Sequence, residues 1–299
     1  MADGVSEILR LVDGWGRRTY PVRWSLRDTI TYAITTGADA RNARSLVWES
    51  APGFTTLPTF ATRFAHEALI DFAAGVQSAA LPSFARAIRV RLHRPLAAEC
   101  AEAHASTALS VKERSGERLV LTLDVETRAD GETIAHSELD VHFRLPGAKT
   151  ARRPAPTAAA GDSETVEVRE GVHPYQAAVF RTLLGLTADG RVQDAMHIDP
   201  VRSRELGLSA PALPGEVTLG IVARLAEQSL GRLGFGGLRG AEVSYRSPVS
   251  DADQLTIRFS PAHDGSVGAE VLNGQGRVAV TGVLRFETGP TGSANGEAP

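Results

Sequence analysis

The feature that most constrains the fold is a helix followed by alternating strands, a plan that occurs twice along the chain. Leu57-Pro58-Thr59 precedes one apolar-periodic segment, and Leu213-Pro214-Gly215 precedes another, 156 residues later. Pro95-Leu96 and Pro248-Val249, 153 residues apart, each lead into segments of alternating apolar and polar residues. Two offsets that agree so closely, in the same order, indicate an internal duplication. We therefore expect each half to be a helix laid on a curved antiparallel sheet.

Helix signals come first in the N-terminal half. Ser25 with an acid three residues later is a capping-box pattern, and it predicts a helix over about 26–36. Apolar positions between 60 and 72 recur at helical spacing and predict a second helix that runs to Gly75. The segment from Ser45 to Glu49 is expected to form an edge segment of the sheet.

Strand signals follow in both halves. Alternation predicts strands at 88–92, 107–113, 119–128 and 137–143, and again at 243–246, 254–260, 268–272 and 277–286. Short turn signals separate several of them, at Ser115-Gly116, Asp130-Gly131 and Asn273-Gly274. Strands joined by short turns pair antiparallel, and such a sheet has one face available to cover a helix. The expected fold class is α+β, in two copies of one unit.

Composition sets the boundaries of the two units. A stretch rich in Pro, Ala and Gly predicts a linker at 148–165, between a first unit at 1–147 and a second at 166–287. The last twelve residues, 288–299, contain small and polar residues and are expected to be a disordered tail.

Charge and cysteine usage exclude several classes of function. The formal net charge is −3, and no basic stripe is present, which argues against nucleic acid as the main partner. The single cysteine, Cys100, excludes an internal disulfide and a cysteine-based metal cluster. No run approaches about 18 uninterrupted apolar residues, so no membrane association is expected. We expect a cytoplasmic protein, and no metal-ligand spacing is apparent.

The candidate site lies between Asp189 and Gly220. His197 stands just before an Asp199-Pro200 step, which is expected to cap a short helix. Gly215 opens the long helix predicted in the second half. The first N–H groups of a helix lack backbone partners and carry partial positive charge, so they can stabilise an acyl oxygen that becomes negative. An imidazole with an ordinary pKa of about 6.5 suits proton transfer at neutral pH.

Three carboxylates compete as the partner of His197. Asp194 lies three residues before the histidine and is ranked first, because a turn would bring the two side chains face to face. Glu216 is ranked second, in the first turn of the long helix, where an acid is also favoured by the helix dipole. Asp189 sits in an Ala-Asp-Gly turn and would contact substrate only if that loop folds back. Gly215 is the other expected substrate-binding residue.

Several strings, in order, resemble the MaoC-like dehydratases, which include the (R)-specific enoyl-CoA hydratases. The resemblance covers most of residues 20–287 and implies a double hot-dog fold, without a cofactor. The matching strings are Trp24–Asp28 with Tyr32-Ala33, Leu57–Phe60, Met196–Pro200 with Ser203, the approach from Gly207 to Gly220, and Val243–Val249.

The resemblance also implies an activity. It implies a hydro-lyase that dehydrates a 3-hydroxyacyl thioester, or hydrates the enoyl thioester, on coenzyme A or acyl carrier protein in polyketide or fatty-acid metabolism. In that family an aspartate five residues before the histidine shares the proton transfers. Val192 stands at that position here, Asp194 stands at the position of the family's asparagine, and Pro214 replaces a second histidine.

These departures leave a second hypothesis open. The chain would then keep the fold but lose hydratase chemistry, and act as a polyketide-tailoring cyclase or as a non-catalytic acyl-binding or scaffold subunit. Both hypotheses are compatible with a homodimer, since hot-dog sheets often pair edge to edge.

Overall fold

The computed structural model describes residues 2–76, 81–116, 118–145, 165–184, 194–231, 235–261 and 264–287. The predicted tail at 288–299 and the predicted linker, except its last residue, lie outside these ranges. The boundaries of the two units therefore stay a prediction.

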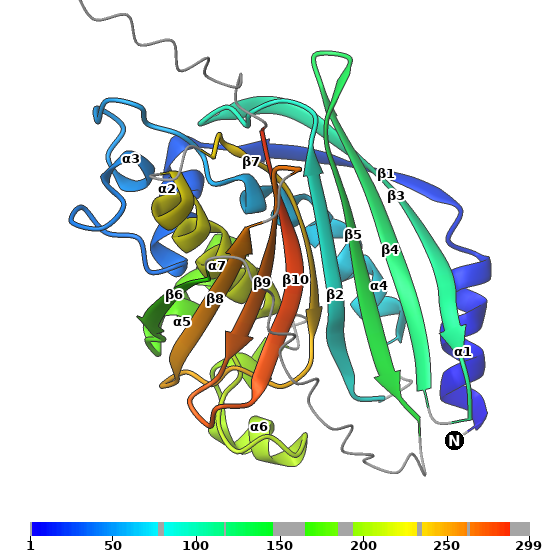
Figure 1. The fold of residues 1–299 in the computed structure, drawn as a ribbon. Helices are drawn as coiled ribbons and strands as arrows, with labels where there is room; N and C mark the ends of the chain where they lie inside the picture. The colour runs from blue at the N-terminus through cyan, green and yellow to red at the C-terminus, as the bar shows by residue number, and fades with distance from the viewer. Residues whose placement is uncertain are drawn as a thin grey trace, which may run out of the picture.

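One ten-stranded sheet runs through the molecule, and every pair of neighbouring strands in it is antiparallel (Figure 1). The first half supplies β1 (Arg17–Trp24), β2 (Ser83–Leu92), β3 (Cys100–Arg114), β4 (Arg118–Ala129) and β5 (Glu132–Arg144). The second half supplies β6 (Val166–Gly171), β7 (Leu238–Tyr245), β8 (Gln254–Pro261), β9 (Ser266–Leu272) and β10 (Val278–Phe286). The strand order is β1-β3-β4-β5-β2-β7-β10-β9-β8-β6, so the pairing of β2 with β7 joins the two halves.

Helices and 3-10 turns pack beside this sheet. They are α1 (Ala2–Asp13), α2 (Leu26–Thr35), α3 (Arg44–Val47), η1 (Pro58–Ala65), α4 (His66–Val76), α5 (Tyr175–Leu184), η3 (Asp194–His197), α6 (Pro200–Glu205) and α7 (Gly215–Leu230). Both η1 and α7 contact β2 and β7, and they also contact each other. None of the helices in the described ranges has the length and hydropathy needed to cross a bilayer.

The core lies between these helices and one face of the sheet. Along β2, Ile88, Val90 and Leu92 are buried, whereas Arg91 between them is exposed, as expected of a strand with one covered face. Every residue of α7 from Val217 to Ala226 is buried. A helix that is buried on all sides must be central to the fold.

Local signals predicted several element boundaries correctly. The backbone N–H of Asp28 donates to the Ser25 hydroxyl, and the Asp28 carboxylate accepts from the Ser25 N–H, so the capping box before α2 is confirmed. The Asp199 carboxylate accepts from the Val201 N–H at 2.8 Å and caps α6. The Asn273 side chain accepts from the N–H groups of the turn between β9 and β10.

The prediction that residues 45–49 form an edge segment of the sheet is wrong. Residues Arg44–Val47 form the short helix α3, which packs against α2, and the two edges of the sheet are β1 and β6. The N–H groups of Leu46 and Trp48 donate to the nearby carbonyls of Ala43 and Arg44. Local bonds of this kind satisfy the backbone without a partner strand.

Candidate active site at the junction of the two halves

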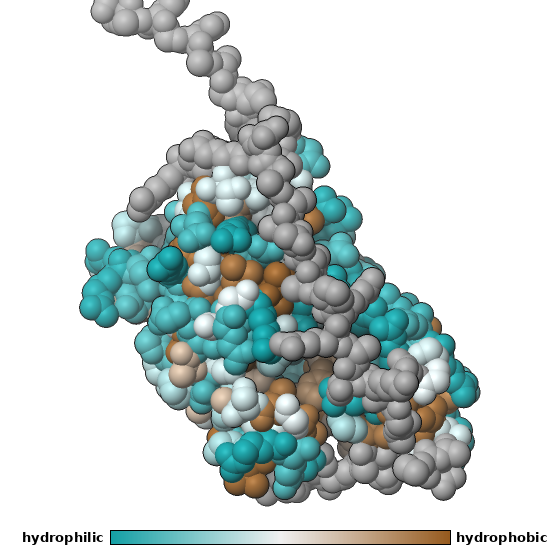
Figure 2. Space-filling model, turned by 60° about the horizontal axis from the view of Figure 1, so that its bottom comes forward, coloured by the Kyte–Doolittle hydropathy of each residue, from teal (hydrophilic) through white to brown (hydrophobic). Residues whose placement is uncertain are grey.

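A cavity of about 320 Å³ lies where the β2–β7 ladder ends. The last registered pair on this side is Ala87 with Ser244, and beyond it the two strands continue with other partners. The cavity occupies this gap and takes its lining from both halves. The first half contributes Phe84, Ala85, Arg86, His142 and Arg144. The second half contributes residues of η3, the turn after α6, the first turn of α7 with the segment before it, and the end of β7 with the segment after it. Figure 2 shows the side of the molecule that carries α6, where hydrophobic and hydrophilic residues both reach the surface.

His197 lines this cavity and is held by backbone groups. Its Nδ1 lies 2.6 Å from the carbonyl oxygen of Ala212. A carbonyl can only accept, so Nδ1 carries the hydrogen, and Nε2 is the basic nitrogen of the neutral ring. The segment itself is fixed by the buried Ser203 hydroxyl, which lies 2.8 Å from the carbonyl oxygen of Met196 and 2.9 Å from that of Asp199.

The start of α7 forms another wall of the cavity. Gly215 lines it, and Pro214 is the N-cap, without a side-chain cap. The Leu213 N–H donates to the carbonyl of Val249 at 2.7 Å, which ties the entry of the helix to the segment after β7. The first N–H groups of this helix have no intrahelical acceptor, so they can bind an acyl oxygen.

Two tyrosines hold the first turn of α7: Tyr32 is fully buried, and Tyr245 is partly buried. The Tyr245 hydroxyl donates to the Gly215 carbonyl at 2.6 Å. The Tyr32 hydroxyl lies 3.2 Å from the Glu216 carbonyl oxygen and 3.1 Å from the Thr59 hydroxyl. Burial, with the Glu216 charge as a smaller cause, raises the pKa of Tyr245 well above its ordinary value and also raises that of Tyr32. Both phenols therefore stay protonated and act as donors.

A side chain at position 215 would disturb this contact. A Cβ added to Gly215 would lie 3.1 Å from Cζ of Tyr245, which is tighter than ordinary van der Waals contact. The glycine therefore lets the phenol and the start of the helix approach closely.

The structure brings together two of the five residues expected in the site. His197 and Gly215 line the same cavity, whereas Glu216, in the first turn of α7, is not among the lining residues. Asp194 begins η3, but its side chain lies outside the described part of the chain, as does all of Asp189. Which carboxylate pairs with His197 therefore stays a prediction.

Sequence reasoning missed the residues that the first half contributes. Arg86, His142 and Arg144 come from the adjoining ends of β2 and β5, and no motif marks them. Tyr245 and Arg246 fall inside the Val243–Val249 string, so that string contained a signal for the cavity that was interpreted only as a strand.

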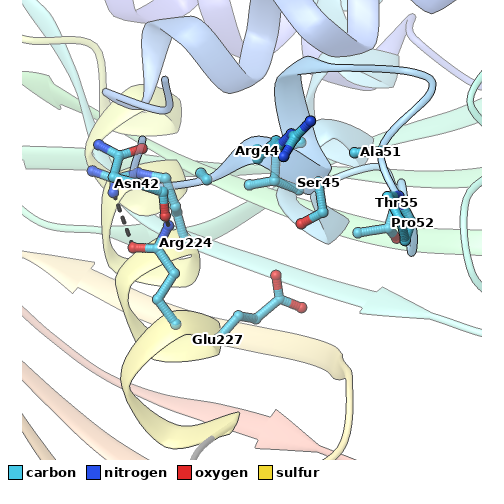
Figure 3. A pocket seen from close by; sticks show the side chains of 11 residues that line it. Asn42, Arg44, Ser45, Ala51, Pro52, Thr55, Arg224 and Glu227 are labelled. Atoms are coloured by element: carbon cyan, nitrogen blue, oxygen red, sulfur yellow. Dashed lines mark hydrogen bonds between the residues drawn. The ribbon is translucent and has the colours of Figure 1, made fainter. Parts of the chain in front are cut away.

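A second pocket, of about 430 Å³, lies between residues 42–55 and the last turns of α7 (Figure 3). Arg224, only 1% exposed, donates to the Thr36 carbonyl at 2.9 Å and forms an ion pair with Glu170. Burial raises the pKa of Glu227, whose carboxylate accepts from the Leu238 N–H at 3.2 Å. These polar groups join α7 to both halves, so we assign them a structural role.

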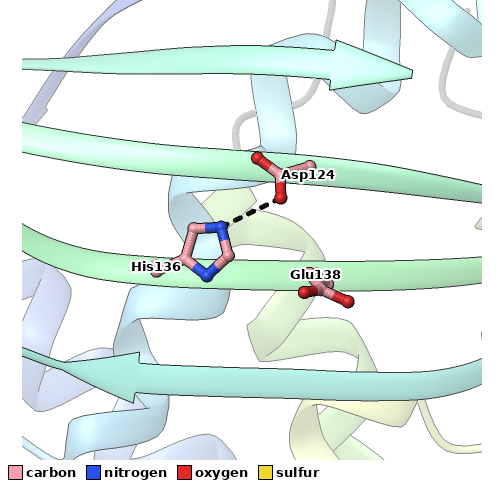
Figure 4. A group of neighbouring side chains, drawn as sticks. All are labelled: Asp124, His136 and Glu138. Carbon is pink, nitrogen blue, oxygen red and sulfur yellow. Dashed lines mark hydrogen bonds and ion pairs between the residues drawn. The ribbon is translucent and has the colours of Figure 1, made fainter. Parts of the chain in front are cut away.

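Asp124, His136 and Glu138 form a half-buried group on β4 and β5 whose donor atoms lie within 4.8 Å of one another (Figure 4). No metal-ligand spacing marks this group in the sequence, because its residues come together only through the pairing of β4 with β5. His136 Nε2 lies 2.9 Å from the Asp124 carboxylate, and Arg89 donates to Glu138 at 2.6 Å. Side chains of the protein therefore already contact both carboxylates, and we assign no metal to this group.

The comparisons identify the fold. No family model and no curated protein matches the chain. A MaoC-like dehydratase from Phytophthora capsici is 19% identical, with 96% of this chain and 99% of that chain covered and a TM-score of 0.72. The full-length peroxisomal multifunctional enzyme type 2 of Drosophila melanogaster is 17% identical with a TM-score of 0.71; the match covers 96% of this chain but only 52% of that one.

A third similar structure is described by its architecture. A protein of Mycobacterium tuberculosis described as having a double hot-dog fold is 15% identical, with 90% of this chain and 94% of that chain covered and a TM-score of 0.56. Identities this low establish shared architecture and leave activity open. The chain has the double hot-dog fold of the MaoC-like dehydratases.

Proposed function

We propose that the chain is a hydro-lyase that dehydrates a 3-hydroxyacyl thioester, or hydrates the corresponding enoyl thioester. The observation that carries the proposal is the pairing, in one cavity, of an oriented imidazole and the start of a long buried helix. The structural relatives described as a MaoC-like dehydratase and a multifunctional enzyme support this choice of reaction class. Coenzyme A or acyl carrier protein would present the acyl group.

The reaction removes a proton from C2 and a hydroxyl from C3 of the acyl chain. His197 accepts the C2 proton at Nε2, since Nδ1 is bonded to the Ala212 carbonyl. The C–H electron pair forms the C2=C3 double bond, and the C3–O bond breaks. The departing hydroxyl takes a proton and leaves as water. Asp194 or Glu216 would share these proton transfers with the imidazole.

The helix start stabilises the charge that develops at the thioester. Loss of the C2 proton moves negative charge onto the carbonyl oxygen, and the Gly215 N–H, at the positive end of α7, would donate to that oxygen. Donors that are already fixed before the reaction lower its barrier most. Tyr245 and Tyr32, which hold the first turn, supply that fixation.

A panel of 3-hydroxyacyl and enoyl thioesters, on coenzyme A and on acyl carrier protein, tests the proposal. We expect turnover by the wild type and a loss of kcat/KM of about 10²–10⁴-fold in His197→Ala, as for removal of a general base. Asp194→Asn and Glu216→Gln determine which carboxylate takes part. Unchanged activity in all three variants would contradict the assignment of the active site to these residues.

Val192 favours a second candidate function. With valine in place of the expected aspartate, the cavity would bind an acyl intermediate without dehydrating it, as a tailoring cyclase or a non-catalytic subunit does. A wild type that binds acyl thioesters but turns over none of the panel would support this candidate over the hydro-lyase.

A further inference from the structure

The junction cavity is lined by a second imidazole that the proposed reaction does not use. His142 lies on β5, opposite Phe84 on β2 and Val120 on β4. It lines the same cavity as His197, although the two histidines come from different halves of the chain. The cavity thus has an imidazole on each side of the junction.

The His142 ring contains a buried nitrogen without a partner. Its Nε2 is shielded from solvent and forms no hydrogen bond with the described part of the chain. Folded proteins rarely bury a polar atom in this way, and when they do, a bound water, ion or ligand is a common explanation. The residue lines the cavity, so rotation of the ring about its Cβ–Cγ bond would present this nitrogen to a ligand.

The surroundings of His142 carry positive charge. Burial first, and then the charges of Arg86, Arg118 and Arg144, lower the pKa of His142, so the ring is neutral near pH 7 and can donate from Nε2. Arg86 is paired with Glu113 at 2.7 Å. Arg144 and Arg246, which also line the cavity, form no ion pair with a carboxylate within the described ranges. An anionic group would therefore be attracted to this wall.

We propose that His142 and Arg144 form a subsite for a phosphate group of the ligand, with the His142 Nε2–H donating to a phosphate oxygen. The choice of ligand rests on the proposed function, since both coenzyme A and the arm of an acyl carrier protein carry phosphate. The first half of the chain would then select the carrier, while the second half performs the chemistry.

Two matched substitutions test the subsite. His142→Phe keeps a ring of similar shape but removes the nitrogens, and His104→Phe makes the same change at an exposed histidine on β3, away from the cavity. Each protein is titrated calorimetrically with coenzyme A and with pantetheine, which lacks phosphate. Inorganic pyrophosphate is added as a competitor to distinguish a carrier phosphate from free phosphate.

We expect the wild type to bind coenzyme A more tightly than pantetheine, and His142→Phe to weaken coenzyme A binding about tenfold, the loss of one charge-assisted hydrogen bond. Pantetheine binding stays the same. The thermal midpoint of His142→Phe equals or exceeds that of the wild type, because no protein hydrogen bond is removed and an unpartnered buried nitrogen is replaced by carbon. His104→Phe changes neither quantity. Pyrophosphate that displaces coenzyme A from the wild type but not from His142→Phe identifies a general phosphate site.

Three results would overturn the subsite. They are equal binding of coenzyme A and pantetheine by the wild type, unchanged coenzyme A binding in His142→Phe, and a lower thermal midpoint in that variant, which would show that the ring has a structural partner. Binding that follows the expected pattern without turnover of any thioester would leave the subsite in place and reject the hydro-lyase.

Discussion

The Tyr245 hydroxyl offers a sharp test of how the fold holds the proposed site. It donates to the Gly215 carbonyl at 2.6 Å, and its ring lines the junction cavity. Tyr245→Phe removes one oxygen and leaves the ring in place. The variant therefore separates the hydrogen bond from the packing.

The expected loss of stability follows from that single bond. An intramolecular hydrogen bond contributes about 1 kcal/mol net to the free energy of unfolding. For a chain of this size, that corresponds to a fall in thermal midpoint of about 1–2 °C. The catalytic loss is expected to be larger than this stability loss suggests, at about tenfold in kcat, because the first turn of α7 would no longer be fixed against the thioester oxygen.

Thermal unfolding and steady-state turnover of an enoyl thioester are measured side by side. Tyr175→Phe is the matched control, because Tyr175 is 47% exposed and lies outside the cavity; neither quantity should change in it. A Tyr245→Phe variant with lowered stability but wild-type kcat would refute the claim that the phenol positions the helix start for catalysis.

Three further perturbations test the packing and the electrostatics. Arg224→Gln should lower the free energy of unfolding by about 3 kcal/mol in denaturant titrations, because it leaves Glu170 partly buried without its cation; a loss below about 1 kcal/mol would contradict this. Burial alone would raise the pKa of Asp140, but hydrogen bonds from Arg89, Lys112 and Thr122 lower it below its ordinary value. The stability that Asp140 contributes is therefore present above its unfolded pKa of about 4 and is lost as the pH falls through the lower folded pKa. Asp140→Asn should reduce the difference between the free energies of unfolding measured at pH 7 and at pH 3. An unchanged difference would contradict this role of Asp140. Ser25→Ala should cost about 1 kcal/mol through loss of the α2 cap, whereas Ser25→Asp, which keeps an acceptor, should recover most of it.

Much of the fold could be predicted because the relevant signals are local. The capping box at Ser25 and the proline at 58 mark the start of helices, and alternation over 119–128 and 254–260 marks strands that the structure confirms as parts of β4 and β8. The segment 45–49 could not be assigned from its residues, because a run of apolar residues too short to show a period fits a strand or one helical turn equally well.

The site was harder to predict, because it forms between segments far apart in sequence. His197 and Gly215 could be found from motifs within one half. His142 and Tyr245 come together only because β2 pairs with β7 as far as Ala87 and Ser244, and nothing local in either strand specifies where that ladder ends. The register of the β2–β7 pairing determines which residues face the junction between the two halves, and the periodicity of each strand does not determine that register.

The most direct test of the account is the rate at which the protein hydrates an enoyl thioester, measured for the wild type and for His197→Ala with the folded state of both verified by thermal unfolding. The account predicts turnover by the wild type and a loss of kcat/KM of at least about 10²-fold in the folded variant. A folded His197→Ala protein that retains wild-type kcat/KM would contradict the account.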